Sequence, residues 1–213
     1  DDFEMITITE VNEPPILGVI GNRVVAEGDT LSFTAAALDI DVPANGLTFS
    51  LDAGAPAEAT IHPQTGAFSW TPGEVDGPGS FPVTVRVTDD GTPNRDDFET
   101  ITITVTEVNQ PPVLTPIGDQ TVVEGDTMSF TAMTTGPDAP ANGLTFSLDP
   151  GAPITATIDP VTGAFILPTT EGDGPGILLV TVRVTDDGAP NLSDFVTITI
   201  TVLDVVTVER RVS

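Results

Sequence analysis

Threonine alternates with an aliphatic residue throughout Thr100-Ile101-Thr102-Ile103-Thr104-Val105. The same two-residue period governs Thr84-Val85-Arg86-Val87-Thr88. Successive side chains of a β-strand point to opposite faces, so this period predicts strands with an aliphatic buried face and a threonine-rich outer face. Clusters of Gly, Pro, Asn and Asp separate the strand-like stretches. No segment resembles an amphipathic helix of useful length. The sequence therefore predicts an all-β fold.

An internal repeat with an offset of 97 residues organises the chain. The motif Glu10-Val11-Asn12-Glu13-Pro14-Pro15 returns as Glu107-Val108-Asn109-Gln110-Pro111-Pro112, and residues 43–52 return unchanged at 140–149. Self-similarity at a fixed offset predicts two copies of one module. We expect the copies at residues 12–108 and 109–206. Residues 1–11 read as the last strand of a preceding copy, and residues 207–213 as a C-terminal extension.

Each copy should contain about seven short strands. In the first copy we expect them near residues 16–26, 30–37, 47–52, 58–62, 66–71, 81–89 and 97–107. About seven strands in a module of roughly a hundred residues, separated by turn residues, are typical of a Greek-key sandwich of the immunoglobulin kind. The predicted fold class is therefore all-β, with two tandem antiparallel Greek-key β-sandwiches.

The composition excludes several classes of function. The chain has 213 residues, with 6 Lys+Arg against 32 Asp+Glu, and its formal net charge is −26. Such a charge repels polyphosphates, so we expect neither a nucleic-acid partner nor binding to an anionic membrane. The absence of Cys excludes disulfides, thiolate metal sites and cysteine nucleophiles. No apolar run reaches about 18 residues, so membrane insertion of this segment is not expected.

With these motifs, the chain resembles tandem cadherin-like repeats of the bacterial type, which are related to dystroglycan-type cadherin-like and immunoglobulin-like modules of large surface proteins. In that family, calcium lies at the junction of consecutive modules and takes ligands from both modules and from the linker. The resemblance implies metal ligands at Glu10, Asn12, Glu13, Glu107 and Asn109 in the linkers, at Glu27, Glu74 and Asp76 in the upstream role, at Asp39, Asp41, Asn45 and Asp89 in the downstream role, and at Asp138, Asn142 and Asp186 in the second copy.

Calcium suits such a set because it accepts about six to eight oxygen ligands in irregular geometry. Without metal the carboxylates repel one another, so an apo junction should flex and a calcium-loaded junction should stiffen. The second copy has Gly136-Pro137-Asp138 where the first has Asp39-Ile40-Asp41, and Gln110 where the first has Glu13. We therefore expect weaker calcium binding between the two copies.

The resemblance implies a calcium-binding segment of an extracellular or cell-surface protein, serving as a calcium-stiffened stalk or adhesion module whose export signal lies outside this chain. Its partners would be Ca²⁺, and also neighbouring repeats, copies of itself or surface glycans. An enzyme is not expected, because the sequence offers no Ser-His-Asp set, no phosphate-binding loop and no paired-His metal site.

Two alternatives stay open. The first is a carbohydrate-binding module pair of a secreted enzyme, for which an exposed Trp70 would supply a sugar-stacking surface and a buried Trp70 would count against the idea. The second is a subunit of an extracellular filament, in which Ile6-Thr7-Ile8-Thr9 completes the sandwich of a neighbouring molecule.

Aromatic residues that recur with the repeat offset are expected in the core, as is Trp70. The recurring pairs are Phe33 and Phe130, Phe49 and Phe146, Phe68 and Phe165, and Phe98 and Phe195. The only histidine, His62, precedes Pro63 and is expected in a turn rather than as a catalytic base.

Overall fold

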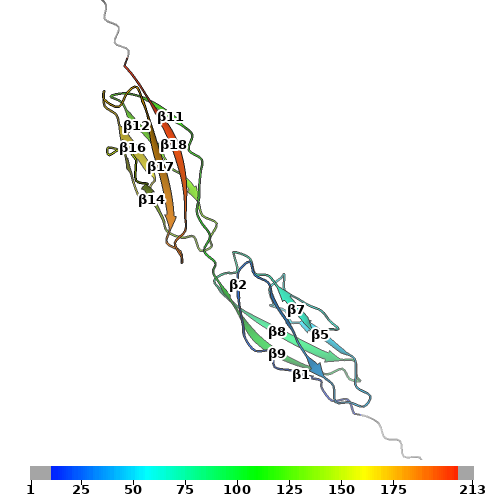
Figure 1. The fold of residues 1–213 in the computed structure, drawn as a ribbon. Coiled ribbons are helices and arrows are strands. Elements are labelled where there is room, and N and C mark those ends of the chain that lie inside the picture. Colours follow the sequence, from blue (N-terminus) through cyan, green and yellow to red (C-terminus); the bar gives the residue numbers. More distant parts are fainter. Residues whose placement is uncertain (1–10, 206–213) are drawn as a thin grey trace, which may run out of the picture. The chain divides into compact units, whose positions relative to one another are not determined.

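The computed structural model describes residues 11–205 of the chain (Figure 1). The chain divides into two compact units, residues 1–108 and 109–213. The expectations for residues 1–10 and 206–213, among them the strand-like segment Ile6-Thr7-Ile8-Thr9 and the ligand Glu10, lie outside the described residues. Residues 11–205 contain no helix with the length and apolar character needed to cross a membrane.

The described part of the first unit is built from strands. They are β1 (Ile16–Leu17), β2 (Arg23–Ala26), β3 (Leu31–Thr34), β4 (Ala37–Leu38), β5 (Leu47–Leu51), β6 (Thr60–Ile61), β7 (Ala67–Trp70), β8 (Gly79–Asp89) and β9 (Asp96–Thr106). Two expected strands are each interrupted. Between β1 and β2, Gly21 adopts a left-handed conformation with φ 73°, which breaks the extended backbone. Between β3 and β4, the Ala35 N–H turns to the Gly66 carbonyl.

The second unit repeats this order. Its strands are β10 (Val113–Leu114), β11 (Gln120–Val123), β12 (Thr127–Thr131), β13 (Thr134–Thr135), β14 (Leu144–Leu148), β15 (Thr157–Ile158), β16 (Ala164–Pro168), β17 (Gly176–Asp186) and β18 (Ser193–Leu203). The all-β fold class with two sandwich modules is confirmed.

Within residues 11–205, each unit is a sandwich of a four-stranded and a three-stranded sheet. The first unit has the orders β2-β9-β8-β5 and β3-β7-β6, and the second has β11-β18-β17-β14 and β12-β16-β15. The short pairs β1–β4 and β10–β13 complete them. Most neighbours are antiparallel, but β2 runs parallel to β9 and β11 runs parallel to β18, unlike the wholly antiparallel expectation. No hairpin joins these strands, so no turn forces them to be antiparallel.

Aliphatic residues of the inward faces form one core in each unit. On β9, Ile101, Ile103 and Val105 are at most 1% exposed, and the threonines between them face outward, as the alternation predicted. Trp70 is only 2% exposed and packs edge-on against Phe81, with 5.0 Å between the ring centroids. Its predicted place in the core is confirmed, and the carbohydrate-binding alternative loses its aromatic surface there.

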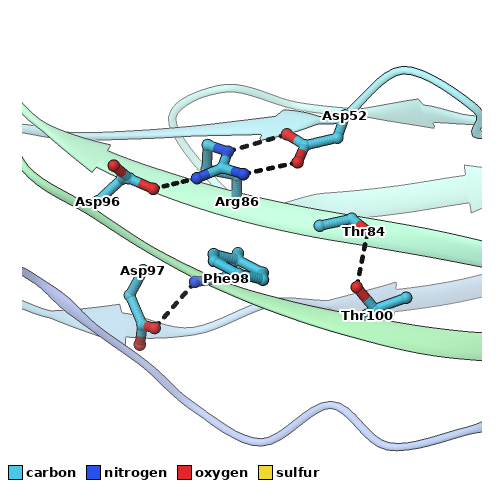
Figure 2. Close-up of polar contacts among 7 residues, drawn as sticks. All are labelled: Asp52, Thr84, Arg86, Asp96, Asp97, Phe98 and Thr100. Atoms are coloured by element: carbon cyan, nitrogen blue, oxygen red, sulfur yellow. Dashed lines mark hydrogen bonds and ion pairs between the residues drawn. The ribbon is translucent and has the colours of Figure 1, made fainter.

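The core prediction is wrong for Phe98 and Phe195, which are 56% and 57% exposed. Phe98 shares the parity of Thr100 on β9, so the strand period places its side chain on the outer face. Figure 2 shows the guanidinium of Arg86 over the Phe98 ring, 4.8 Å from its centroid. Arg86 also donates two hydrogen bonds to Asp52, at 2.9 and 2.7 Å. The cation–π contact therefore covers part of an aromatic ring that lies outside the core.

His62 lies in a turn, as predicted. Its Nδ1 accepts hydrogen bonds from the N–H groups of Gln64 and Thr65 at 3.2 and 3.3 Å. Asp159 accepts the corresponding pair in the second unit, at 3.0 and 2.8 Å. The imidazole thus has the same turn-closing role as a carboxylate one repeat later.

Candidate metal centres

Three acidic residues converge at the end of the first unit where β2 and β9 finish. We call Glu27, Glu74 and Glu107 the Glu27 cluster, because their carboxylate oxygens lie within 4.8 Å of one another. Glu27 follows β2 and Glu107 follows β9, and the last residues of these parallel strands, Ala26 and Thr106, are direct partners. The register therefore brings two glutamates together, and the loop before β8 adds the third.

Glu27 is the most buried member of the Glu27 cluster, at 7% exposed. Its Oε1 accepts a hydrogen bond from the Val108 N–H at 3.0 Å, whereas its Oε2 is buried with no hydrogen-bond partner. A buried polar atom without a partner calls for an explanation, such as an ion. Carboxylate oxygens converging from separate segments are the hard ligands that Ca²⁺ prefers, so these residues fit the implied metal.

Asp76 has a different place from its sequence neighbour Glu74. Its Oδ2 accepts a hydrogen bond from the Gly73 N–H at 2.8 Å, which closes the turn before β8. Asp173 makes the same kind of contact with Thr170 in the second unit, at 2.6 Å. Of the two acids predicted in this loop, the structure brings only Glu74 into the cluster with Glu27.

A second group of polar residues lies at the opposite end of the first unit. We call it the Asp89 cluster, after the last residue of β8; its members are Asn12, Glu13, Asp39, Asp41, Asn45 and Asp89. The Asn12 amide donates to Asp89 at 3.1 Å, and the Asn45 amide donates to Asp41 at 3.2 Å. The Glu13 backbone N–H donates to both Asp41 oxygens at 3.2 and 3.3 Å, while its side chain is exposed.

Asp39 and Asp89 are the members of the Asp89 cluster with the clearest electrostatic features. The Oδ1 of Asp39 accepts the Asp41 N–H at 2.9 Å, and its Oδ2 is buried with no hydrogen-bond partner. Burial alone would raise the pKa of Asp89, which is 2% exposed. Hydrogen bonds from the Arg95 N–H, the Asn12 amide and the Gly91 N–H outweigh burial and hold that pKa below its ordinary value of 3.8. Asp89 is therefore a carboxylate at neutral pH.

The second unit has a corresponding group, the Asp186 cluster, made of Asn109, Asp138, Asn142 and Asp186. The Asn109 amide donates to Asp186 at 3.1 Å, and the Asn142 amide donates to Asp138 at 2.6 Å. Asp138 and Asp186 are 7% and 3% exposed, and Asp186 Oδ2 is buried with no hydrogen-bond partner. Asp138, Asn142 and Asp186 line a small cavity of about 50 Å³. Gly136, which stands where the first unit has the carboxylate of Asp39, lines it too.

The pKa of Asp186 is lowered in the same way as that of Asp89. Burial would raise it, but hydrogen bonds from the Leu192 N–H, the Asn109 amide and the Gly188 N–H lower it below 3.8. Asp186 is therefore a carboxylate at neutral pH, but its cluster has two carboxylates fewer than the Asp89 cluster, because Gly136 and Gln110 stand where the first unit has Asp39 and Glu13.

A fourth group, the Glu124 cluster, was not among the expected metal ligands. Glu124, Glu171 and Asp204 line a hollow of about 490 Å³ where β11 and β18 end. Glu124 is 7% exposed, its Oε1 accepts the Val205 N–H at 3.0 Å, and its Oε2 is buried with no hydrogen-bond partner. The offset of 97 residues carries the members of the Glu27 cluster onto these three positions, so the repeat itself was the signal that could have found them.

Comparisons with known proteins agree with the architecture. Residues 14–106 match the family model described as "Putative Ig domain". The chain is 31% identical over 216 residues to Protocadherin Fat 4 of Mus musculus and 26% identical over 218 residues to Protocadherin Fat 1 of Homo sapiens. These alignments cover 93% and 94% of this chain but only 4% and 5% of the relatives, so the chain spans a small part of their length.

Solved cadherin structures share the fold. Mouse Cadherin-23 EC22-24 superposes with a TM-score of 0.59 at 21% identity, covering 92% of this chain and 67% of that chain. Human Protocadherin-24 EC1-2 superposes with a TM-score of 0.54 at 16% identity, covering 91% of this chain and 99% of that chain. At such identities the likeness establishes the fold of the two units.

Proposed function

Because the two modules are cadherin-like, immunoglobulin-like repeats, we propose that they form a calcium-binding segment of an extracellular surface protein, acting as a calcium-stiffened stalk or adhesion module. The observation that carries the proposal is the Glu27 cluster, in which three carboxylates converge and the Oε2 of Glu27 is buried without a hydrogen-bond partner. Bound calcium would supply the positive charge that such a group lacks.

The Glu27 cluster is costly without a cation. Two unit charges 4.8 Å apart repel by about 0.9 kcal/mol in water and by about 3.5 kcal/mol at an effective dielectric constant of 20. Folding brings these carboxylates together, so the folded protein gains more from a divalent cation than the unfolded chain does. That difference is what couples metal binding to stability.

In the second unit, we propose that the Asp186 cluster is a weaker calcium site than the Asp89 cluster. Both provide two buried carboxylates and two asparagine amides. Replacement of Asp39 by Gly136 removes the carboxylate whose second oxygen is buried without a partner in the first unit. Ligand charge is one of the quantities that set calcium affinity, so this loss should weaken binding.

The linker takes part in a cluster of each unit, which suggests how metal could stiffen the chain. Glu107 belongs to the Glu27 cluster, and Asn109, two residues later, belongs to the Asp186 cluster. The residue between them, Val108, donates its N–H to Glu27. Metal held at either cluster would restrict the backbone of these three residues. Extracellular calcium modules commonly bind in the range of about 10⁻⁴–10⁻³ M, which suits a surface location.

A melt combined with small-angle X-ray scattering tests the proposal. The chain would be measured in EDTA, in millimolar Ca²⁺ and in millimolar Mg²⁺. We expect calcium alone to raise the melting temperature, with a stabilisation of about 2.7 kcal/mol at a hundredfold excess over its dissociation constant. Calcium should also narrow the distribution of interatomic distances. If the melting temperature and the scattering are the same in EDTA and calcium, the acidic clusters are solvated surface and the proposal is wrong.

A further inference from the structure

One half of β17 has a strand neighbour on a single side. β18 pairs with β17 from Gly176 to Thr185, whereas β14 pairs only with Val182–Asp186, and Figure 1 shows β14 beside the arrowhead end of β17. The Asp149 N–H adds a bond to the Thr181 carbonyl at 3.0 Å. No strand within residues 11–205 pairs with the same side of Gly176–Val180. This half of β17 is therefore a sheet edge.

The backbone of Ile177 and Leu179 faces that open side. In an antiparallel ladder, the N–H and C=O of one residue point to the same neighbour, and successive residues alternate. Because the Thr181 carbonyl faces the β14 side, the peptide groups of Leu179 and Ile177 do so as well. An edge with unpaired N–H and C=O groups is a template for another extended strand.

Apolar side chains surround the edge. Ile177 and Leu179 are 69% and 60% exposed, and Ile154, in the loop after β14, is fully exposed. All three line a surface hollow of about 580 Å³ that also reaches Leu178, a residue packed against the core. Because the hollow reaches both a core-packed residue and outward-facing residues, it lies along the edge of the sandwich.

Among the described residues, the corresponding half of β8 in the first unit also lacks a strand on one side, because β5 pairs only with Val85–Asp89, but different residues occupy it. The residues 97 positions earlier than Ile177, Leu179 and Ile154 are Ser80, Pro82 and Ala57. Pro82 has no N–H to offer, and proline on an edge strand is a known device against unwanted pairing. The second unit therefore has large aliphatic residues around the hollow at the three positions where the first unit has a small residue or proline.

We propose that the open edge of β17 is a docking site for an extended segment of another protein, one that carries aliphatic side chains at alternate positions and basic residues at its ends. The segment would add a strand beside Gly176–Val180, with main-chain hydrogen bonds to Ile177 and Leu179 and apolar contacts to the hollow. This site lies within the second unit and does not rest on the proposed calcium binding.

Charge decides between this partner and a second copy of the chain. The charged residue lining the hollow is Asp173, whose carboxylate accepts the Thr170 N–H and hydroxyl; these bonds lower its pKa below 3.8 and keep it ionised. The whole chain has a net charge of −26, so a second copy would be repelled and a basic segment attracted.

The test measures binding of a short fluorescent peptide, in which Val alternates with Thr between Arg flanks, to the whole chain in EDTA. We expect saturable binding by anisotropy, with amide shifts at Ile177 and Leu179 in NMR spectra. Leu179→Pro should weaken binding about tenfold or more, because it removes a main-chain donor and an apolar side chain. The first unit carries proline at this position, so the variant should fold. Leu179→Thr keeps the donor and should lose less.

A gain of function completes the design. Ser80→Ile with Pro82→Leu gives the corresponding edge of the first unit a main-chain donor and two of the three aliphatic side chains, and it should add a second binding site. Equal binding by wild type and Leu179→Pro would overturn the proposal, as would no binding to the wild type. Equal affinity for a peptide with Glu flanks would refute the basic partner. Self-association that Leu179→Pro abolishes would show that a second copy is the occupant.

Discussion

Glu27→Gln should stabilise the metal-free protein and at the same time remove much of its response to calcium. The substitution keeps an oxygen that can accept the Val108 N–H, now bonded to Glu27 Oε1 at 3.0 Å, and it removes one charge from the Glu27 cluster. A purely structural role of Glu27 could not produce both effects, because losing a structural contact destabilises the protein with or without metal.

The size of the first effect follows from the geometry. At 4.8 Å, the upper limit of the distances between the ligand oxygens of the Glu27 cluster, two carboxylate charges repel by about 0.9–3.5 kcal/mol, according to the local dielectric constant. Glu27 takes part in two such pairs, and its partners are half-exposed, so a gain of about 1–3 kcal/mol is expected for the metal-free first unit. One kcal/mol moves the melting temperature of a domain of this size by about 4–8 °C.

The second effect appears on adding calcium. An amide oxygen is a weaker ligand than a carboxylate, so the variant should lose most of the stabilisation, about 2.7 kcal/mol at a hundredfold excess, that calcium gives the wild type. Thermal melts of both proteins in EDTA and in calcium give four temperatures, and the rise in melting temperature on adding calcium should be much smaller for Glu27→Gln than for the wild type.

Glu58→Gln is the matched control, because it makes the same chemical change at an exposed turn of the same unit. It should leave all four temperatures within the range of an ordinary surface substitution, about 0.5 kcal/mol. The reasoning is refuted if Glu27→Gln lowers the melting temperature in EDTA while the rise on adding calcium stays at its wild-type size.

Three further predictions concern the Asp186 cluster, the ion pair between Arg86 and Asp52, and Trp70 in the core of the first unit. Gly188→Ala should lower the free energy of unfolding by about 1–3 kcal/mol and weaken calcium binding by the Asp186 cluster, because the added Cβ would overlap the side-chain amide of Asn109. Gly136→Ala is the control, because its Cβ would meet open space. It should change neither the thermal melt nor the calcium affinity measured by titration calorimetry. Asp52→Asn should lower stability above pH 4 in urea melts, and the gap to wild type should close as the pH falls below 3.8, because hydrogen bonds from Arg86 lower the pKa of the folded carboxyl. The emission of Trp70, the only tryptophan, should be blue-shifted and should report unfolding of the first unit alone.

The clusters show how far a repeat can predict a site. Glu27, Glu74 and Glu107 were expected from the cadherin resemblance, and the structure brings them together. The same offset carries these residues onto Glu124, Glu171 and Asp204, which were not among the expected ligands because the linker motif decays around Asp204. Asp76 was expected as a ligand, yet its carboxylate closes a turn, a choice set by local backbone geometry that the residue type alone does not reveal.

Phe98 shows a different kind of error. Its recurrence as Phe195 suggested the core, but parity along β9 already placed it with the outward threonines. Local period was the better guide there, because a strand fixes the direction of each side chain whatever its hydrophobicity. The contact with Arg86 then offsets part of the cost of the exposed ring (Figure 2).

The sequence by itself determined the all-β class, the two modules and the outward and inward faces of the long strands, because these depend on a period of two and a repeat of 97 that are local or directly visible. Only the tertiary structure decided which acids meet and where a sheet edge stays open. The Glu27 cluster depends on the parallel register of β2 and β9, and the open half of β17 depends on where β14 stops pairing. Both are set by packing between segments far apart in the chain, which no local pattern encodes.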